Sequence, residues 1–286
     1  MTIIARFNDN RLGVVQGDVI KDVTSVLDRL PAHHYPLPTH DIFIAALPEL
    51  LGAIEGEADK AEGIPLSSVT FLSPVANPGK LVAAPVNYLK HLEEAQTDPA
   101  LHHQNQIATI HRAGLFLKAT SSLVGSSHGI EVALPDRRTD HEIELCAIIG
   151  KRAKNVSKEE ALEYVAAYSL GLDITIRGPE ERSLRKSLDT YSVLGPWMVT
   201  ADEIPDPDNL DFSLEINGEV RQRANTRDLI LGVAELIELA SRFYTLEPGD
   251  IIYTGTPEGV APILPGDTLH ASIEKVGEFT VEVRAA

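Results

Sequence analysis

Hydrophobic and polar residues alternate in short runs near the start of the chain. A period of two places successive side chains on opposite faces of a strand. Breaks rich in Asn, Asp and Gly separate these runs. We therefore predict a small antiparallel β unit followed by a helical segment near Ile42–Leu51, with strands at Ile3–Phe7, Gly13–Gln16 and Val19–Asp22.

Residues 73–79 read Ser-Pro-Val-Ala-Asn-Pro-Gly, a composition typical of a linker. This segment divides the chain into a small N-terminal domain of residues 1–75 and a main domain of residues 76–286. Short strands dominate the main domain as well, and its helices are few and separated. The pattern predicts a β-rich α+β fold and not a parallel α/β sheet.

Several elements of the main domain can be placed from their pattern. Two apolar runs predict strands at Lys80–Ala84 and Glu142–Ile149. Asn217-Gly218 predicts a two-residue hairpin turn between Phe212–Ile216 and Glu219–Gln222.

Three helices are predicted in the same region. Asn87–Gln96 has helical spacing. Ser157 and Glu160 form a capping box that predicts a helix as far as about Ser169. Thr226 is the expected cap of a third helix, whose apolar stripe consists of Leu229, Val233, Leu236, Ile237, Ala240 and Phe243.

Composition narrows the functional classes. The chain has 286 residues with 43% hydrophobic and 23% charged, which is ordinary for a globular protein. Its 25 basic and 42 acidic residues give a net charge of −17, which argues against nucleic acid or an anionic membrane as partner. Cys146 is the single cysteine, so no intrachain disulfide and no thiolate zinc site is expected. With neither a signal-peptide pattern nor an apolar run of about 20 residues, we expect a cytoplasmic protein.

Glu142 and Glu144 occupy alternate positions of a predicted strand, so both carboxylates point to one face. Asp173 lies in the apolar run 169–176, where an unpaired acid would be costly to bury. Three carboxylates suit Mg²⁺, Mn²⁺ or Ca²⁺. The alternative is that the two glutamates form the solvated face of an edge strand.

His91 and Glu94 lie three residues apart and can meet on one helix face. A carboxylate fixes the tautomer of an imidazole and favours its protonated form, as a general base requires. Lys186, in a cationic stretch, could hold a substrate carboxylate or stabilise an oxyanion. For all three residues the alternative is an ordinary charged surface.

Taken in order, these segments resemble the fumarylacetoacetate hydrolase family from about Lys80 to the C-terminus. The shared order of many modest motifs carries the resemblance. They are Asn87-Tyr88-x-x-His91-x-x-Glu94, Phe116-Leu117-Lys118, Ser121-Ser122-Leu123-Val124-Gly125, His141-Glu142-Ile143-Glu144-Leu145, Asp173 with Arg177, Lys186-Ser187-Leu188-Asp189-Thr190, Leu194-Gly195-Pro196-Trp197, Asn217-Gly218-Glu219, Thr245-Leu246-Glu247-Pro248-Gly249-Asp250 and Thr254-Gly255-Thr256-Pro257.

The resemblance implies a mixed β-sandwich roll, paired into a homodimer, with Mg²⁺ or a similar ion at Glu142, Glu144 and Asp173. It places His91 and Glu94 on a lid helix and makes Lys186 the active-site lysine. It implies substrate contacts at Tyr88, Arg177, Glu180, Thr190 and Thr256. Two positions depart from the family pattern. Glu180 stands where a substrate-contacting glutamine is usual, and Pro85-Val86 replaces a glycine-arginine pair.

The activity that the resemblance implies is hydrolytic cleavage of a carbon–carbon bond in a 2,4-dioxo acid or acylpyruvate, with His91 activating water. Metal-dependent decarboxylation or keto–enol isomerisation of a 2-oxo dicarboxylic acid remains an alternative. A non-catalytic metabolite sensor is a further possibility, although a sensor has no evident use for a base paired with a carboxylate. Residues 97–114 are expected to cover the pocket.

Overall fold

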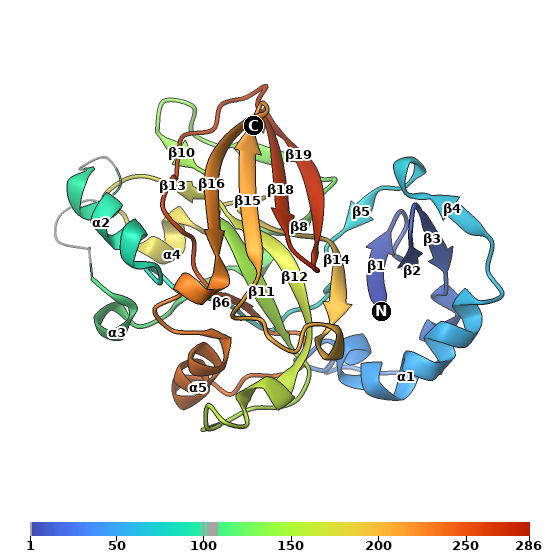
Figure 1. Cartoon of the computed structure of the whole chain (residues 1–286). Helices are drawn as coiled ribbons and strands as arrows, with labels where there is room; N and C mark the ends of the chain where they lie inside the picture. Colours follow the sequence, from blue (N-terminus) through green and yellow to red (C-terminus); the bar gives the residue numbers. More distant parts are fainter. Residues whose placement is uncertain (1, 99–100, 102–107) are drawn as a thin grey trace.

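β-Sheets dominate the computed structural model, which describes residues 2–98, 101 and 108–286 (Figure 1). Among these residues, twelve strands form one mixed sheet and five form a second. A large hydrophobic cluster contains side chains from both sheets and from helix α5 (Val233–Phe243). The β-rich α+β class predicted from the pattern is confirmed.

The large sheet begins in the N-terminal region and ends at β7 (Phe116–Lys118). Its main path, in spatial order, is β4 (Gly63–Pro65), β3 (Val19–Asp22), β2 (Arg11–Gln16), β1 (Ile3–Phe7), β14 (Ser192–Thr200), β12 (Val165–Asp173), β11 (Ile143–Ile149), β17 (Ile251–Tyr253), β6 (Leu81–Ala83) and β7 (Phe116–Lys118). β5 (Phe71–Leu72) pairs with β1, and β8 (Leu123–Gly125) pairs with β14.

The second sheet covers one face of the central strands. Its order is β16 (Glu219–Asn225), β15 (Asp211–Ile216), β18 (Thr268–Ile273), β19 (Gly277–Ala285) and β9 (Ile130–Val132), and β10 (Thr139–Asp140) pairs separately with β13 (Thr175–Ile176). The predicted hairpin is confirmed at β15 and β16. Its turn residues Asn217 and Gly218 have φ of 52° and 81°, as a two-residue turn of this hand requires.

The N-terminal strands and their helix follow the prediction closely. α1 (Ile42–Ala58) lies beside β1 to β3 and buries Phe43, Ile44 and Leu47 in a second hydrophobic cluster (Figure 1). β1 pairs with β14 through Ile3 and Ile4, so both regions of the chain share one sheet. The boundary between residues 75 and 76 stays a prediction.

The remaining helices are short, and the helix predicted near Asn87 is confirmed. They are α2 (Leu89–Thr97), α3 (Ile110–Ala113) and α4 (Arg182–Arg185). In Figure 1, α2 and α3 lie on the side of the molecule away from the N-terminal strands. Among the described residues, no helix is long and apolar enough to cross a membrane. The expectation for residues 97–114 includes 99–100 and 102–107, which lie outside the described residues, and it stays a prediction.

The helix predicted from Ser157 to about Ser169 is wrong. Residues Ala161–Tyr164 form a short 3₁₀ turn, and β12 begins at Val165. Strand β12 pairs with β11 on one side and β14 on the other, and its side chains are almost all buried. Because two ladders of hydrogen bonds and burial outweigh a local capping signal, the segment is a central strand.

The third predicted helix begins later than expected. Thr226 starts a 3₁₀ turn, and its hydroxyl accepts a hydrogen bond from the Leu210 N–H. Helix α5 starts at Val233, whose N–H donates to Asp208 Oδ1 at 2.9 Å. The predicted stripe is buried from Val233 to Ala240, whereas Phe243 is 67% exposed.

Candidate active site

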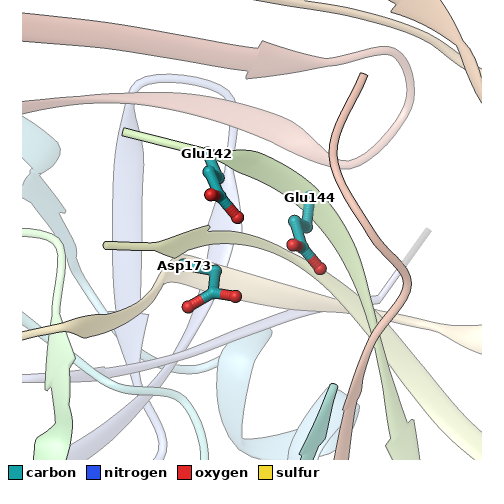
Figure 2. Close-up of side chains that lie close together, drawn as sticks. All are labelled: Glu142, Glu144 and Asp173. Atoms are coloured by element: carbon teal, nitrogen blue, oxygen red, sulfur yellow. The ribbon is translucent and has the colours of Figure 1, made fainter. Parts of the chain in front are cut away.

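Three buried carboxylates converge at the centre of the large sheet (Figure 2). Glu142 immediately precedes β11, Glu144 lies on it, and Asp173 ends the neighbouring strand β12. The Asp173 N–H donates to the Glu142 carbonyl oxygen at 2.8 Å, which fixes the two strands' register at this point. One carboxylate oxygen from each residue lies within 4.8 Å of the other two. Their burial and convergence contradict the alternative that the two glutamates form the solvated face of an edge strand.

Two buried lysines are bound to this acidic cluster. Lys186 Nζ donates to Glu142 Oε2 at 2.7 Å and to Asp173 Oδ2 at 2.6 Å. It also donates to Thr175 Oγ1 at 2.6 Å. Lys118 Nζ donates to the other Asp173 carboxylate oxygen and, at 2.8 Å, to the Tyr191 carbonyl oxygen. Asp173 is thus held by one ammonium on each side.

The two glutamates have opposite electrostatic environments. Burial alone would raise the pKa of Glu142, but Lys186, Arg177 and His91 outweigh it and bring the pKa well below its ordinary value. Burial raises the pKa of Glu144 well above its ordinary value, and repulsion from Asp173 and Glu142 adds to it. The Gly255 N–H donates to Glu144 Oε2 at 2.7 Å and opposes that rise only in part. A cation among the three carboxylates would relieve their repulsion.

His91 and Glu94 meet on α2 as their spacing predicts. His91 Nδ1 lies 2.9 Å from Glu94 Oε2, and the histidine is buried. Glu94 Oε1 accepts a hydrogen bond from the Gly259 N–H at 2.9 Å, which docks α2 onto the loop after β17. His91 lines the same pocket as Glu142 and Lys186, so the histidine and one carboxylate of the acidic cluster share a cavity. We call this cavity the site pocket.

Arg177 closes one side of the site pocket. Its Nη2 donates to Glu142 Oε1 at 3.0 Å and its Nε to Asp140 Oδ2 at 2.8 Å. Although burial would lower the pKa of this guanidinium, Glu142 and Asp140 raise it above its ordinary value. Arg177 therefore carries a fixed positive charge beside the acidic cluster.

The other expected substrate contacts are more scattered. Tyr88 is buried and packs edge-to-face on Phe212, with ring centroids 6.2 Å apart. The Thr190 hydroxyl accepts from the Glu131 N–H at 2.9 Å, and the Thr256 hydroxyl accepts from Gln222 Nε2 at 2.8 Å.

Glu180 forms a two-armed ion pair with Arg137 at 2.7 and 2.9 Å and does not line the site pocket. The hydrogen bonds to Arg137 lower the pKa of Glu180. Its carboxylate is therefore already neutralised outside the cavity.

Sequence reasoning missed several side chains at the site. Lys118 is fully buried against Asp173; its sequence signals are a lysine ending an apolar run and its place in the motif Phe116-Leu117-Lys118, neither of which assigned it a role. Arg182 and Arg185 line the site pocket together with Lys186, although the stretch reads as an exposed basic surface. The available sequence signal was three basic residues within residues 182–186, shortly after the predicted metal ligand Asp173.

Comparison with known proteins bears on this site. The fumarylacetoacetate (FAA) hydrolase C-terminal family model matches residues 80–284. The chain belongs to the fumarylacetoacetate hydrolase family.

A maleylpyruvate hydrolase from Aquipseudomonas alcaligenes is 56% identical over 284 residues, covering 99% of each chain. The crystal structure of a maleylpyruvate hydrolase from Sphingobium sp. SYK-6, in complex with manganese(II) and pyruvate, matches with a TM-score of 0.85. It is 40% identical and covers 99% of each chain. A mitochondrial oxaloacetate tautomerase from Rattus norvegicus is 36% identical over 226 residues, covering 75% of this chain and 69% of its own.

Proposed function

We propose that this protein is a metal-dependent hydrolase that cleaves a carbon–carbon bond in an acylpyruvate, a 2,4-dioxo acid. The observation that carries the proposal is one pocket lined by His91, Glu142 and Lys186, with Glu144 and Asp173 beside them. Two full-length relatives with the name maleylpyruvate hydrolase support it and make maleylpyruvate the first substrate to test.

Glu142, Glu144 and Asp173 would hold the cation. Three converging carboxylates form the all-oxygen donor set that Mg²⁺ and Mn²⁺ prefer, and Ca²⁺ accepts the same ligands. An ion bound there would polarise the oxo-acid end of the substrate and would stabilise negative charge on it.

His91 is the proposed general base. Glu94 Oε2 lies 2.9 Å from its Nδ1 and would keep the proton on that nitrogen, which makes Nε2 the nitrogen that takes a proton from water. The water oxygen attacks the carbonyl carbon of the acyl group, and the bond from that carbon to the pyruvyl methylene breaks. The products are the carboxylate of the acyl group and pyruvate, whose methyl group gains a proton.

Lys186 and Arg177 are the proposed partners of the substrate's oxo-acid end. Both are buried cations beside Glu142, so they can offset charge on a bound carboxylate or oxyanion. We propose further substrate contacts at Tyr88, Thr190 and Thr256. For Glu180, whose carboxylate is held by Arg137, we propose an indirect role at the pocket edge.

A second candidate is tautomerisation of a 2-oxo dicarboxylic acid, favoured by the 36% identical oxaloacetate tautomerase; decarboxylation of such an acid belongs to the same alternative. Neither reaction adds water to a carbonyl carbon. The products therefore separate the candidates.

The test is turnover of maleylpyruvate and acetylpyruvate in ¹⁸O-labelled water with Mn²⁺ or Mg²⁺. Hydrolysis releases pyruvate and places the label in the new carboxylate of maleate or acetate. Glu142→Ala should abolish both metal binding and turnover. Release of CO₂, or enol–keto exchange with no cleavage, would instead support the second candidate.

We also propose a homodimer, as the family resemblance implies, and a cytoplasmic location. The lone cysteine, buried and free, suits a reducing compartment. Light scattering should give twice the chain mass of 31.1 kDa; a mass of one chain at working concentration would contradict the dimer.

A further inference from the structure

The site pocket carries more positive charge than hydrolysis at the acidic cluster explains. Its polar and charged lining residues are His91, Glu142, Arg177, Arg182, Arg185 and Lys186. Arg177 and Lys186 are each bound to two carboxylates. Arg182, on α4, is the lining cation whose guanidinium has no such partner among the described residues.

Arg182 is a half-buried cation without a carboxylate partner. Among the described residues, no hydrogen bond or ion pair joins its guanidinium to another group. Its guanidinium carbon lies 5.5 Å from the centre of the Phe116 ring, a weak interaction compared with a salt bridge. Burial lowers its pKa, while Glu142 and Asp173 act in the opposite direction from farther away.

Arg185 lies three residues later, so the two guanidiniums share one side of the short helix. Its Nε donates to the Glu180 carbonyl oxygen at 2.9 Å, which fixes the guanidinium at the pocket wall. Burial lowers the pKa of Arg185 as well, and repulsion from Arg177 and Arg182 lowers it further. An anion bound between these cations would relieve that repulsion.

Arg182 lies about one helical turn before Lys186 in the chain, at the start of α4. Lys186 Nζ also lies 5.5 Å from the Phe116 ring centre, so Lys186 and Arg182 flank the same ring. Four residues of helix separate their backbones by about 6 Å. A substrate whose oxo-acid end lies at Lys186 can therefore extend its acyl end toward Arg182.

We propose that Arg182, supported by Arg185, binds a second carboxylate at the acyl end of the substrate. The preferred substrates are then acylpyruvates whose acyl group carries a terminal carboxylate. Guanidinium binds carboxylate through paired hydrogen bonds, and a neutral acyl group would leave Arg182 without a counter-ion. This inference rests on the proposed hydrolysis for its reaction, but its binding test does not.

The kinetic test compares maleylpyruvate, with a distal carboxylate, and acetylpyruvate, without one, on the Mn²⁺-loaded enzyme. Arg182→Ala should lower kcat/KM for maleylpyruvate by about 10- to 100-fold, mainly through KM, and for acetylpyruvate by less than about threefold. Arg182→Lys should recover part of the loss, since the charge remains while the paired geometry is lost. The matched control is Arg152→Ala, an exposed arginine paired with Glu247 away from the site pocket.

Equal losses on both substrates, or no loss on either, would overturn the proposal. The binding arm uses 2-oxoheptanedioate and 2-oxoheptanoate, which match in length and differ only in the distal carboxylate. Calorimetry with Mn²⁺ present should give at least tenfold tighter binding of the dioate to the parent protein. Arg182→Ala should remove that preference, and Arg152→Ala should keep it.

The two arms separate the possible failures. If no acylpyruvate is hydrolysed but the dioate preference depends on Arg182, the proposed function fails and the carboxylate subsite stands. If acylpyruvates are hydrolysed and the parent protein binds both probes equally, the subsite fails and the proposed function stands.

Discussion

His91 is buried, faces Glu142 across a shared pocket and has one ring nitrogen occupied by Glu94. These three properties are what a general base needs, because tautomer and position are fixed before substrate arrives. Glu94 in turn is held by the Gly259 N–H, so the dyad depends on the loop after β17.

Replacing His91 by alanine should leave Mn²⁺ affinity within about threefold of the parent while kcat falls by about 10²- to 10⁴-fold. The reason is that proton abstraction is lost while Glu142, Glu144 and Asp173 are untouched. Steady-state kinetics and calorimetric Mn²⁺ titration measure the two effects. A full rate in His91→Ala would remove it from the mechanism.

Lys118 holds one Asp173 oxygen from a fully buried position, and burial lowers its pKa while Asp173 opposes that shift. Lys118→Met should therefore weaken Mn²⁺ binding by about 10- to 100-fold, as loss of a residue that orients a metal ligand does. Lys158→Met removes an exposed lysine and serves as the control. Unchanged affinity in Lys118→Met would show that Asp173 needs no such support.

At the scale of elements, the sheet order decides which distant residues meet. Glu142 and Glu144 could be predicted as a pair because strand periodicity is local. The contact between Lys118 and Asp173 could not, because it depends on β7, β6, β17, β11 and β12 lying in that order. Helix α4 likewise shows its role only when the fold places Arg182 at the site pocket.

The helix at residues 157–169 was wrongly predicted for the same reason: the interactions that decide its structure are not local in sequence. Ser157 Oγ donates to Glu160 Oε2 at 3.4 Å, but no side-chain hydrogen bond caps the short 3₁₀ turn that follows, so the predicted capping box does not form. A helix-capping hydrogen bond contributes about 1 kcal/mol to stability. The pairing of β12 on both edges and its burial exceed it, and no local pattern reports those interactions.

Helix α1 depends on its first turn. Asp41 Oδ1 accepts from the Phe43 and Ile44 N–H groups, and Oδ2 accepts from the Ala76 and Asn77 N–H groups. Asp41→Ala would leave these four donors without their acceptor and should lower the free energy of unfolding by about 2 to 4 kcal/mol. Urea unfolding measures the change, with the exposed Asp28→Ala as control; a loss below about 0.5 kcal/mol would contradict this account of the cap.

At the scale of the whole molecule, a net charge of −17 and a buried acidic cluster both favour cation binding. Mn²⁺ at about 100 times its Kd should stabilise the folded protein by about 2.7 kcal/mol, because the ion binds the folded state alone. Urea unfolding with and without Mn²⁺ measures this difference. Glu142→Ala should show almost none of it, and equal stabilisation of both proteins would place the ion elsewhere.

The central claim is that Glu142, Glu144 and Asp173 hold one divalent ion in the pocket that His91 faces. X-ray anomalous scattering at the manganese absorption edge, from crystals of the Mn²⁺-loaded protein, tests it most directly. We predict a single strong peak within coordination distance of all three carboxylates. A catalytically active crystal whose manganese lies elsewhere, with these carboxylates bound only to Lys118 and Lys186, would contradict the account.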